Sequence, residues 1–195
     1  LRFPLRVLRA VKEIVTDRAA LLVKINLNDG FKGGIPLDEA ITAGQAFCAG
    51  GADALVTSGG FVSKAPLYML KGDVPTRDMV KVQTGLLRKV GLALFGRFFV
   101  KEYPFSELFF LDPAQKLMAA VDKPVILLGG VVSKNGLERA LSAGFELFAL
   151  GRATIHDPDF VKKLQSGEIE KSGCDHCNKC IATMDAGGVR CVLED

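Results

Sequence analysis

The sequence PVILLGG, residues Pro124–Gly130, is an apolar run of strand length that stops in two glycines. Three other runs share its length, its aliphatic content and its ending in small or polar residues. They are ALLVKIN (Ala20–Asn26), ADALVTS (Ala52–Ser58) and FELFALG (Phe145–Gly151). None of the four alternates cleanly between apolar and polar residues, which is typical of strands in a parallel sheet that is covered on both faces. We therefore expect four buried parallel strands.

Helical patterns lie between and around these runs. They cover Leu5–Val15, Leu37–Ala49, Asp112–Val121, Lys134–Ala143 and Asp157–Gln165. The order α(βα)4 predicts an α/β fold, in which repeated crossovers of one hand build an open doubly wound sheet or a barrel. The short strand spacing near the C-terminus and the small or polar cluster after every strand favour a (β/α)8 TIM barrel.

Four strands fill only half of such a barrel and leave two sheet edges to be covered. The chain also opens inside an amphipathic pattern, LRFPLRVLRAVKEIV, without a methionine. We interpret residues 1–171 as the C-terminal half of a barrel, strands five to eight, within a longer chain. The alternative is a homo-oligomer in which two copies supply eight strands. Residues 172–195 form a separate cysteine-containing segment.

A long connection of about residues 61–111 separates the second and third runs. Its segment Arg77–Lys101 carries six Lys or Arg and one Asp among many Leu and Phe residues. Such a stretch can lie on a membrane surface or dock a partner. The favoured interpretation is an inserted helical excursion that packs over the barrel mouth or at a subunit contact.

Composition narrows the function classes. With 195 residues, 49% hydrophobic and 24% charged, the chain predicts a soluble globular protein, and a net charge of +3 is too small to indicate nucleic acid binding. No apolar run approaches the ~20 residues of a transmembrane helix. We expect a cytoplasmic protein that acts on a small molecule.

A candidate phosphate site follows the last two strands. Gly151 and Arg152 end the fourth run, and Gly129 and Gly130 end the third. Glycine allows close approach of the backbone to a ligand, and consecutive final strands are where (β/α)8 barrels often bind phosphate. The alternative is that the glycines only make tight turns and that Arg152 pairs with a carboxylate such as Asp157.

Lys24 lies inside an otherwise apolar run, where lysine is rarely tolerated without a partner. If it points towards the mouth of a barrel, it can stabilise negative charge on a bound ring system. The alternative is a structural ion pair with Asp53 or Asp29.

Five segments, in this order and spacing, resemble the C-terminal half of the old yellow enzyme family, the NADH:flavin oxidoreductases. They are VKINLNDGFKGG, LVTSGG, PVILLGGVVSK, FALGRATIHDPDFV and CDHCNKC. The resemblance runs through nearly the whole chain. It implies a barrel that holds FMN without a covalent bond and passes hydride from NAD(P)H to an electron-poor acceptor such as an activated alkene. The competing classes are a half-barrel that binds without turnover and another phosphate-binding barrel enzyme.

The resemblance also implies roles for seven residues. Lys24 would lie against the pyrimidine edge of the flavin and support its anionic reduced form. The remaining six would hold the ribityl phosphate: Ser58, Gly59, Gly129, Gly130, Gly151 and Arg152. The His or Asn pair and the tyrosine that bind substrate in the family belong to the first half of the barrel, so the catalytic residues are not identified. Neither His156 nor His176 matches them, and Tyr103 is expected to pack in the excursion more than to project over the flavin.

The cysteines Cys174, Cys177, Cys180 and Cys191 form a further candidate site, whereas Cys48 is expected to be a small core residue. Thiolates two residues apart with a distant fourth can ligate a [4Fe–4S] cluster or zinc. Relatives that resemble 2,4-dienoyl-CoA reductase carry a cluster here, although their third and fourth cysteines are spaced differently. Free or packed thiols are the remaining alternative.

Overall fold

Four parallel strands form the centre of the protein, as the sequence predicts. The structure is a computed structural model, and it describes residues 1–182, 184 and 187–193. The strands are β1 (Leu22–Asn26), β2 (Ala54–Ser58), β3 (Val125–Leu128) and β4 (Leu147–Ala149). They lie in one sheet in the order β1-β2-β3-β4, and every neighbouring pair is parallel.

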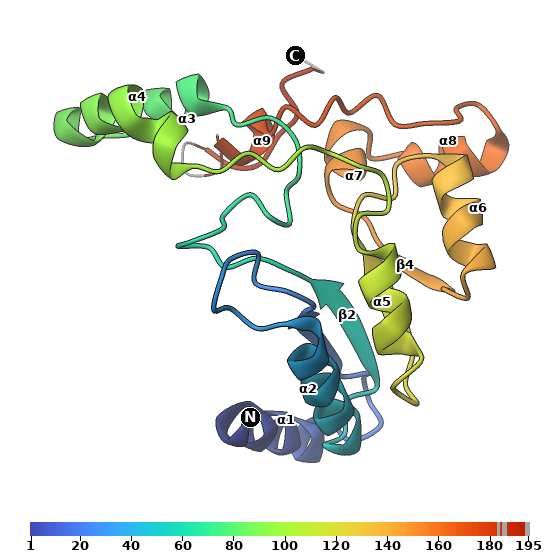
Figure 1. Ribbon diagram of the computed structural model, residues 1–195. Coiled ribbons are helices and arrows are strands. Elements are labelled where there is room, and N and C mark those ends of the chain that lie inside the picture. The colour runs from blue at the N-terminus through green and yellow to red at the C-terminus, as the bar shows by residue number, and fades with distance from the viewer. Residues whose placement is uncertain (183, 185–186, 194–195) are drawn as a thin grey trace.

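The predicted helices are present, α2 with the predicted ends and the others with shifted ends. They are α1 (Arg2–Val15), α2 (Leu37–Ala49), α5 (Leu111–Met118), α6 (Lys134–Ser142) and α8 (Phe160–Ser166). Helices α2 and α5 pack against each other, and α2 contacts β1 and β2 while α5 contacts β3 (Figure 1). A short helix that the sequence did not predict, α7 (Arg152–His156), begins directly after Gly151.

The core lies between the sheet and these helices. Leu55, Leu117 and Leu127 are fully enclosed, and the predicted core residue Cys48 is 7% exposed. The hydroxyl of Thr57, buried in β2, accepts the N–H of Leu128 at 2.8 Å and so ties β2 to the end of β3. This hydrogen bond fixes the position of the end of β3 relative to β2.

The strand register brings the predicted site turns together. Leu128, the last residue of β3, pairs with Ala149, the last residue of β4. Since both strands run in the same direction, the turns that follow them leave the sheet at the same edge. Gly129-Gly130 and Gly151-Arg152 therefore emerge side by side.

The expectation that all four strands are covered on both faces is right for β2 and wrong for β1 and β4. Leu22 in β1 and Leu147 in β4 are 48% and 47% exposed. The reason is topological, because each of these strands has a neighbour on one side only. Beside β1, an apolar groove of about 460 Å³ runs along α1, where Phe3 is 75% exposed.

The excursion after β2 contains helices, as expected. These helices lie away from the sheet (Figure 1), but Met69, Leu70, Phe105 and Phe109 of the excursion lie at the carboxyl ends of the strands. The helices are α3 (Thr76–Val82) and α4 (Leu86–Phe99), which pack on each other, and α3 contacts α9 (Lys179–Ala182) of the C-terminal segment. Several apolar side chains of α4 face solvent, with Leu87 91% exposed. Throughout the described ranges, no helix is both long and apolar enough to cross a membrane.

Candidate functional site

A cavity of about 260 Å³ lies at the carboxyl ends of the strands. Its floor is made by the ends of β3 and β4 and the turns after them. Other walls come from Lys24 of β1, from Met69 and Leu70 of the excursion, and from Phe105 and Phe109 before α5. His176 and Ile181 of the C-terminal segment also line the cavity. Segments far apart in the sequence thus meet at one place.

Most of the predicted site residues line this cavity. The group consists of Lys24, Gly129, Gly130, Gly151 and Arg152. Ser58 and Gly59 lie behind the wall instead. The hydroxyl of buried Ser58 donates to the sulfur of Met69 at 3.2 Å, and Gly59 packs against the rings of Phe110 and Tyr68.

Backbone conformation and packing require glycine in the turn Gly129-Gly130 but not at Gly151. Gly129 and Gly130 have φ values of +148° and +81°, which side-chain-bearing residues rarely adopt. Gly129 packs closely on Phe110, and Gly130 packs on the rings of Phe105 and Phe109. Gly151 has φ −125°, and a Cβ built there would meet no atom within 4 Å. The space beside Gly151 is therefore open for a ligand.

Arg152 does not pair with Asp157, which corrects that alternative. Asp157, which precedes α8, forms an ion pair with Lys163 of that helix, with 2.8 Å between Oδ2 and Nζ. Arg152 instead donates from Nη1 to Oδ1 of Asn178 at 2.8 Å. Among the described residues, no carboxylate lies within ion-pair distance of Arg152. Burial lowers the pKa of this guanidinium and the nearby thiols act in the opposite direction, yet it stays protonated at neutral pH.

Asn178 positions Arg152 and was not identified from the sequence. Its side chain is 1% exposed, and its amide donates to the carbonyls of Leu70 at 2.6 Å and Asp73 at 3.0 Å. These hydrogen bonds connect Asn178 to the excursion and to Arg152. The amide places the guanidinium at the cavity without neutralising its charge.

Lys24 also lacks the partners that the sequence suggested. Asp53 pairs with Lys12 of α1 at 2.8 Å, and Asp29 accepts hydrogen bonds from Asn26 and from the N–H of Ile35. Both carboxylates are occupied, so the structural ion pair is wrong. Lys24 is exposed on the edge strand, with part of its surface in the cavity.

His176 is the least expected residue of the cavity wall. It is 8% exposed, and its ring stacks on Phe105 with the centroids 3.5 Å apart and an interplanar angle of 19°. Nε2 is buried without a hydrogen-bond partner among the described residues. Burial, together with the charge of Arg152, lowers the pKa of His176 to about 4, so the imidazole is neutral at pH 7.

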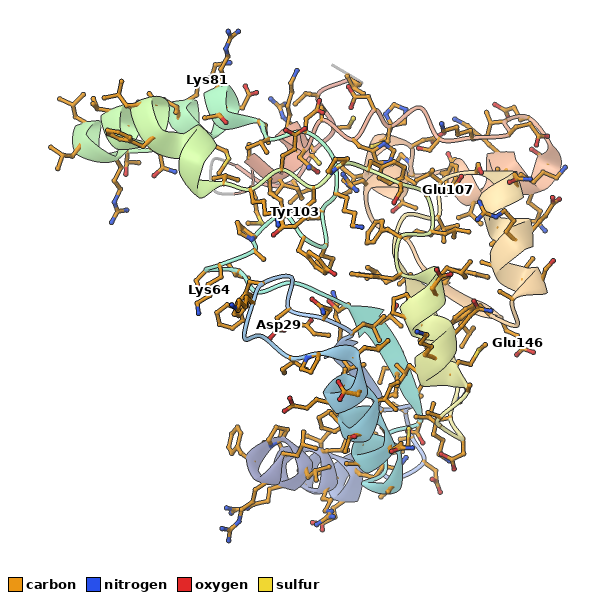
Figure 2. The ribbon with its side chains drawn as sticks, viewed as in Figure 1. Asp29, Lys64, Lys81, Tyr103, Glu107 and Glu146 are labelled. Atoms are coloured by element: carbon orange, nitrogen blue, oxygen red, sulfur yellow. The ribbon has the colours of Figure 1, made fainter. Side chains whose placement is uncertain are left out.

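Tyr103 packs within the excursion, as the favoured interpretation held. Its ring meets Tyr68 edge-on at 5.3 Å, and its hydroxyl is 3.4 Å from the carbonyl oxygen of Gly30, next to Asp29 (Figure 2). Tyr103 does not line the cavity. Glu107, labelled in Figure 2, lies in the segment before α5. Its carboxylate accepts hydrogen bonds from the hydroxyl of Ser133, the predicted cap of α6, and from the N–H of Val132.

The four C-terminal cysteines converge beside Arg152 around a narrow space. Burial raises the pKa of Cys174, Cys177 and Cys180, and the sulfur of Cys191 lies 3.4 Å from Nδ1 of His156. In the described part of the chain, no three His, Cys, Asp or Glu side chains are arranged to hold a metal ion. A [4Fe–4S] cluster or zinc at these cysteines therefore stays a prediction, and the proposed function does not depend on it.

Comparison with known proteins gives no matching family model. The 4,4'-dithiodibutanoate disulfide reductase of Rhodococcus erythropolis is 37% identical over 194 residues, or 99% of this chain and 48% of the relative. The chain therefore spans about half the length of that relative. An imidazole-4-carboxamide isomerase of Roseiflexus sp. (strain RS-1), whose name carries phosphoribosyl groups, is 36% identical over 74 residues, or 37% of this chain and 31% of the relative.

A solved structure supports the fold. The complex of 2-naphthoyl-CoA reductase with 2-naphthoyl-CoA superposes with a TM-score of 0.72 at 16% identity, covering 100% of this chain and 25% of that chain. At this identity the likeness concerns the α/β fold with its parallel sheet.

Proposed function

We propose that this chain is the FMN-holding half of a (β/α)8 barrel, in an old yellow enzyme-type oxidoreductase that passes hydride from NAD(P)H to an electron-poor acceptor. The observation that carries the proposal is the gathering of Lys24, two glycine turns and Arg152 around one cavity. The curated relative is named as a disulfide reductase, which agrees with redox chemistry and adds disulfides to activated alkenes as acceptors to test.

The residues present fit the phosphate of FMN. A partly buried guanidinium without a carboxylate partner favours an anionic ligand, because an uncompensated buried charge is costly. The open space at Gly151 adjoins Arg152 in the sequence, and the hydrogen bond to Asn178 orients the guanidinium of Arg152. Arg152 is thus prepared to bind a phosphate through charge-assisted hydrogen bonds.

The exposed edges of the sheet agree with half of a barrel. Further strands beside β1 and β4 would cover Leu22 and Leu147, and a neighbouring unit would fill the apolar groove of α1. The cavity of about 260 Å³ is slightly smaller than the roughly 300–1,000 Å³ of typical ligand sites. The missing half of the barrel would enlarge and close it.

When bound, FMN would supply the hydride chemistry that protein side chains lack. Arg152 and the glycine turns would hold its phosphate end, and Lys24 would place an ammonium group where negative charge develops. Met69, Leu70, Phe105 and Phe109, which line the cavity, would provide an apolar wall against the bound flavin.

The function is tested by anaerobic spectroscopy of the full-length protein loaded with FMN. Addition of NADH or NADPH should bleach the visible flavin band, and an activated alkene or a disulfide should restore it. Protein that holds FMN but whose band resists both coenzymes would contradict the reductase and favour the non-catalytic half-barrel.

Lys24→Met is expected to lower the reduction potential of bound FMN by some tens of millivolts, because 30 mV corresponds to about 1.4 kcal/mol for a two-electron couple. Methionine keeps much of the apolar stem, so the fold should survive. Potentiometric titration measures the change, with Lys12→Met as the control, since Lys12 pairs with Asp53 outside the cavity. Equal potentials in Lys24→Met and wild type would exclude this role.

A second candidate is a barrel enzyme that binds a phosphate ester without flavin. The similarity to the Roseiflexus isomerase favours it, because the name of that protein carries phosphoribosyl groups. The same Arg152 would serve either ligand. Binding of a sugar phosphate, together with no binding of FMN, would select this candidate.

A further inference from the structure

We propose that His176 is a ligand-binding residue of the cavity, whose Nε2–H donates a hydrogen bond to an anionic phosphate oxygen held beside Arg152. The inference rests on the proposed function, because it takes the cofactor phosphate as the occupant. It adds a donor from the C-terminal segment to a site otherwise built from strand ends.

The first observation is the unsatisfied nitrogen. Nε2 of His176 is buried and makes no hydrogen bond to any described residue, although the side chain is only 8% exposed. Leaving a buried polar group unpaired costs about 1–3 kcal/mol, and native structures rarely tolerate it. His176 also lines the cavity, so we infer that a molecule bound there is the partner of Nε2.

The second observation is that the ring is firmly held. The backbone of His176 has φ +62°, a conformation that is unfavourable for a residue with a side chain. Its carbonyl accepts the N–H of Asp73 at 3.1 Å and lies against Gly72, while the ring stacks on Phe105. The backbone of His176 is thus held by Asp73 and Gly72 and its ring by Phe105, which keeps the ring at the cavity wall.

The third observation is the neighbouring charge. Arg152 lines the same cavity, and its guanidinium carbon lies 5.9 Å from the ring centroid of Phe105, on which His176 stacks. A neutral imidazole has one N–H, and an anion attracted by Arg152 favours the tautomer that carries it on Nε2. His176 and Arg152 can then bind the same phosphate group.

The chain contains two histidines, which makes a direct test feasible. Full-length protein labelled with ¹⁵N-histidine gives ring signals for His156 and His176, which His156→Phe and His176→Phe assign. Ligand-free protein is titrated with inorganic phosphate and, separately, with FMN. We expect the Nε2 signal of His176 to move saturably with both ligands and the signals of His156, which does not line the cavity, to move much less.

Affinity gives an independent readout. His176→Phe keeps the stacking on Phe105 and removes the nitrogen, so FMN should bind about 5- to 10-fold more weakly, as expected for one hydrogen bond. His176→Gln can return an N–H donor and should recover most of the loss. His156→Phe is the matched control and should bind FMN as wild type does.

Two results would overturn the inference: an Nε2 signal that stays in place when phosphate saturates the protein, as expected if only water meets the nitrogen, or unchanged FMN affinity in His176→Phe. Failure of the proposed function looks different, since wild-type protein would then bind no FMN. The phosphate titration still decides the role of His176 in that case.

Discussion

Arg152→Ala is expected to weaken FMN binding by about 1.5–3 kcal/mol, which corresponds to a roughly 10- to 150-fold higher dissociation constant. The guanidinium lines the cavity, is anchored by Asn178 and has no carboxylate partner among the described residues, so its charge is available to the phosphate. Riboflavin has no phosphate and should bind the variant and the wild type within about twofold. Fluorescence titration with the two flavins measures the difference.

Two further variants separate charge from structure. Arg152→Lys keeps the charge but loses the planar fork, so it should recover only part of the affinity. Lys163→Ala removes a basic residue of α8 that is paired with Asp157 outside the cavity, and it should leave FMN binding unchanged. Equal weakening of FMN and riboflavin by Arg152→Ala would show that Arg152 only supports the structure.

Gly72→Ala is expected to destabilise the protein by at least about 2 kcal/mol. Gly72 has φ +144°, and its missing side chain leaves room for the carbonyl of His176, with which a Cβ would collide. To relieve the collision, the C-terminal segment must move away from the excursion. That movement breaks the hydrogen bonds of Asp73 and Asn178 and releases Arg152, so FMN should also bind more weakly.

Chemical denaturation and FMN titration of the same preparation measure both effects of Gly72→Ala. The matched control is Gly91→Ala within α4, where an added Cβ meets no atom within 4 Å. That change should be neutral or should stabilise the helix by up to about 1 kcal/mol. A Gly72→Ala protein as stable as Gly91→Ala would contradict the close packing of the excursion on the C-terminal segment.

The strands and most helices could be predicted because their signals are local. The length of each apolar run and the residues that end it are visible in the sequence itself. Ser133 likewise indicates the start of α6, because its own side chain caps the helix. The parallel order followed from the alternation of strands and helices. Exposure of β1 and β4 could not be read from their residues, since it depends on which strands lack a second neighbour.

Cavity residues on strand ends could be named from the sequence, whereas a residue held by distant contacts could not. Gly129, Gly130, Gly151 and Arg152 follow strands directly, so the parallel register brings them together. Asn178, by contrast, bonds to Leu70 across 108 positions of the sequence.

His176 received no role from the sequence, because it does not match the His or Asn pair that binds substrate in the family. The signals that reveal it are burial and the unpaired nitrogen, which exist only in the folded chain. Similarly, the sequence offered Asp157 as a partner for Arg152, because nothing local shows that Lys163 already occupies it.

Identification of the small molecule released from purified full-length protein tests the central claim most directly. Protein isolated without added flavin is denatured by heat, and the supernatant is analysed by its visible spectrum and by mass spectrometry. We expect FMN in close to one equivalent per complete barrel, with little riboflavin. Colourless protein that also fails to take up added FMN, or that releases a phosphate ester without flavin, would contradict the assignment of this cavity to FMN.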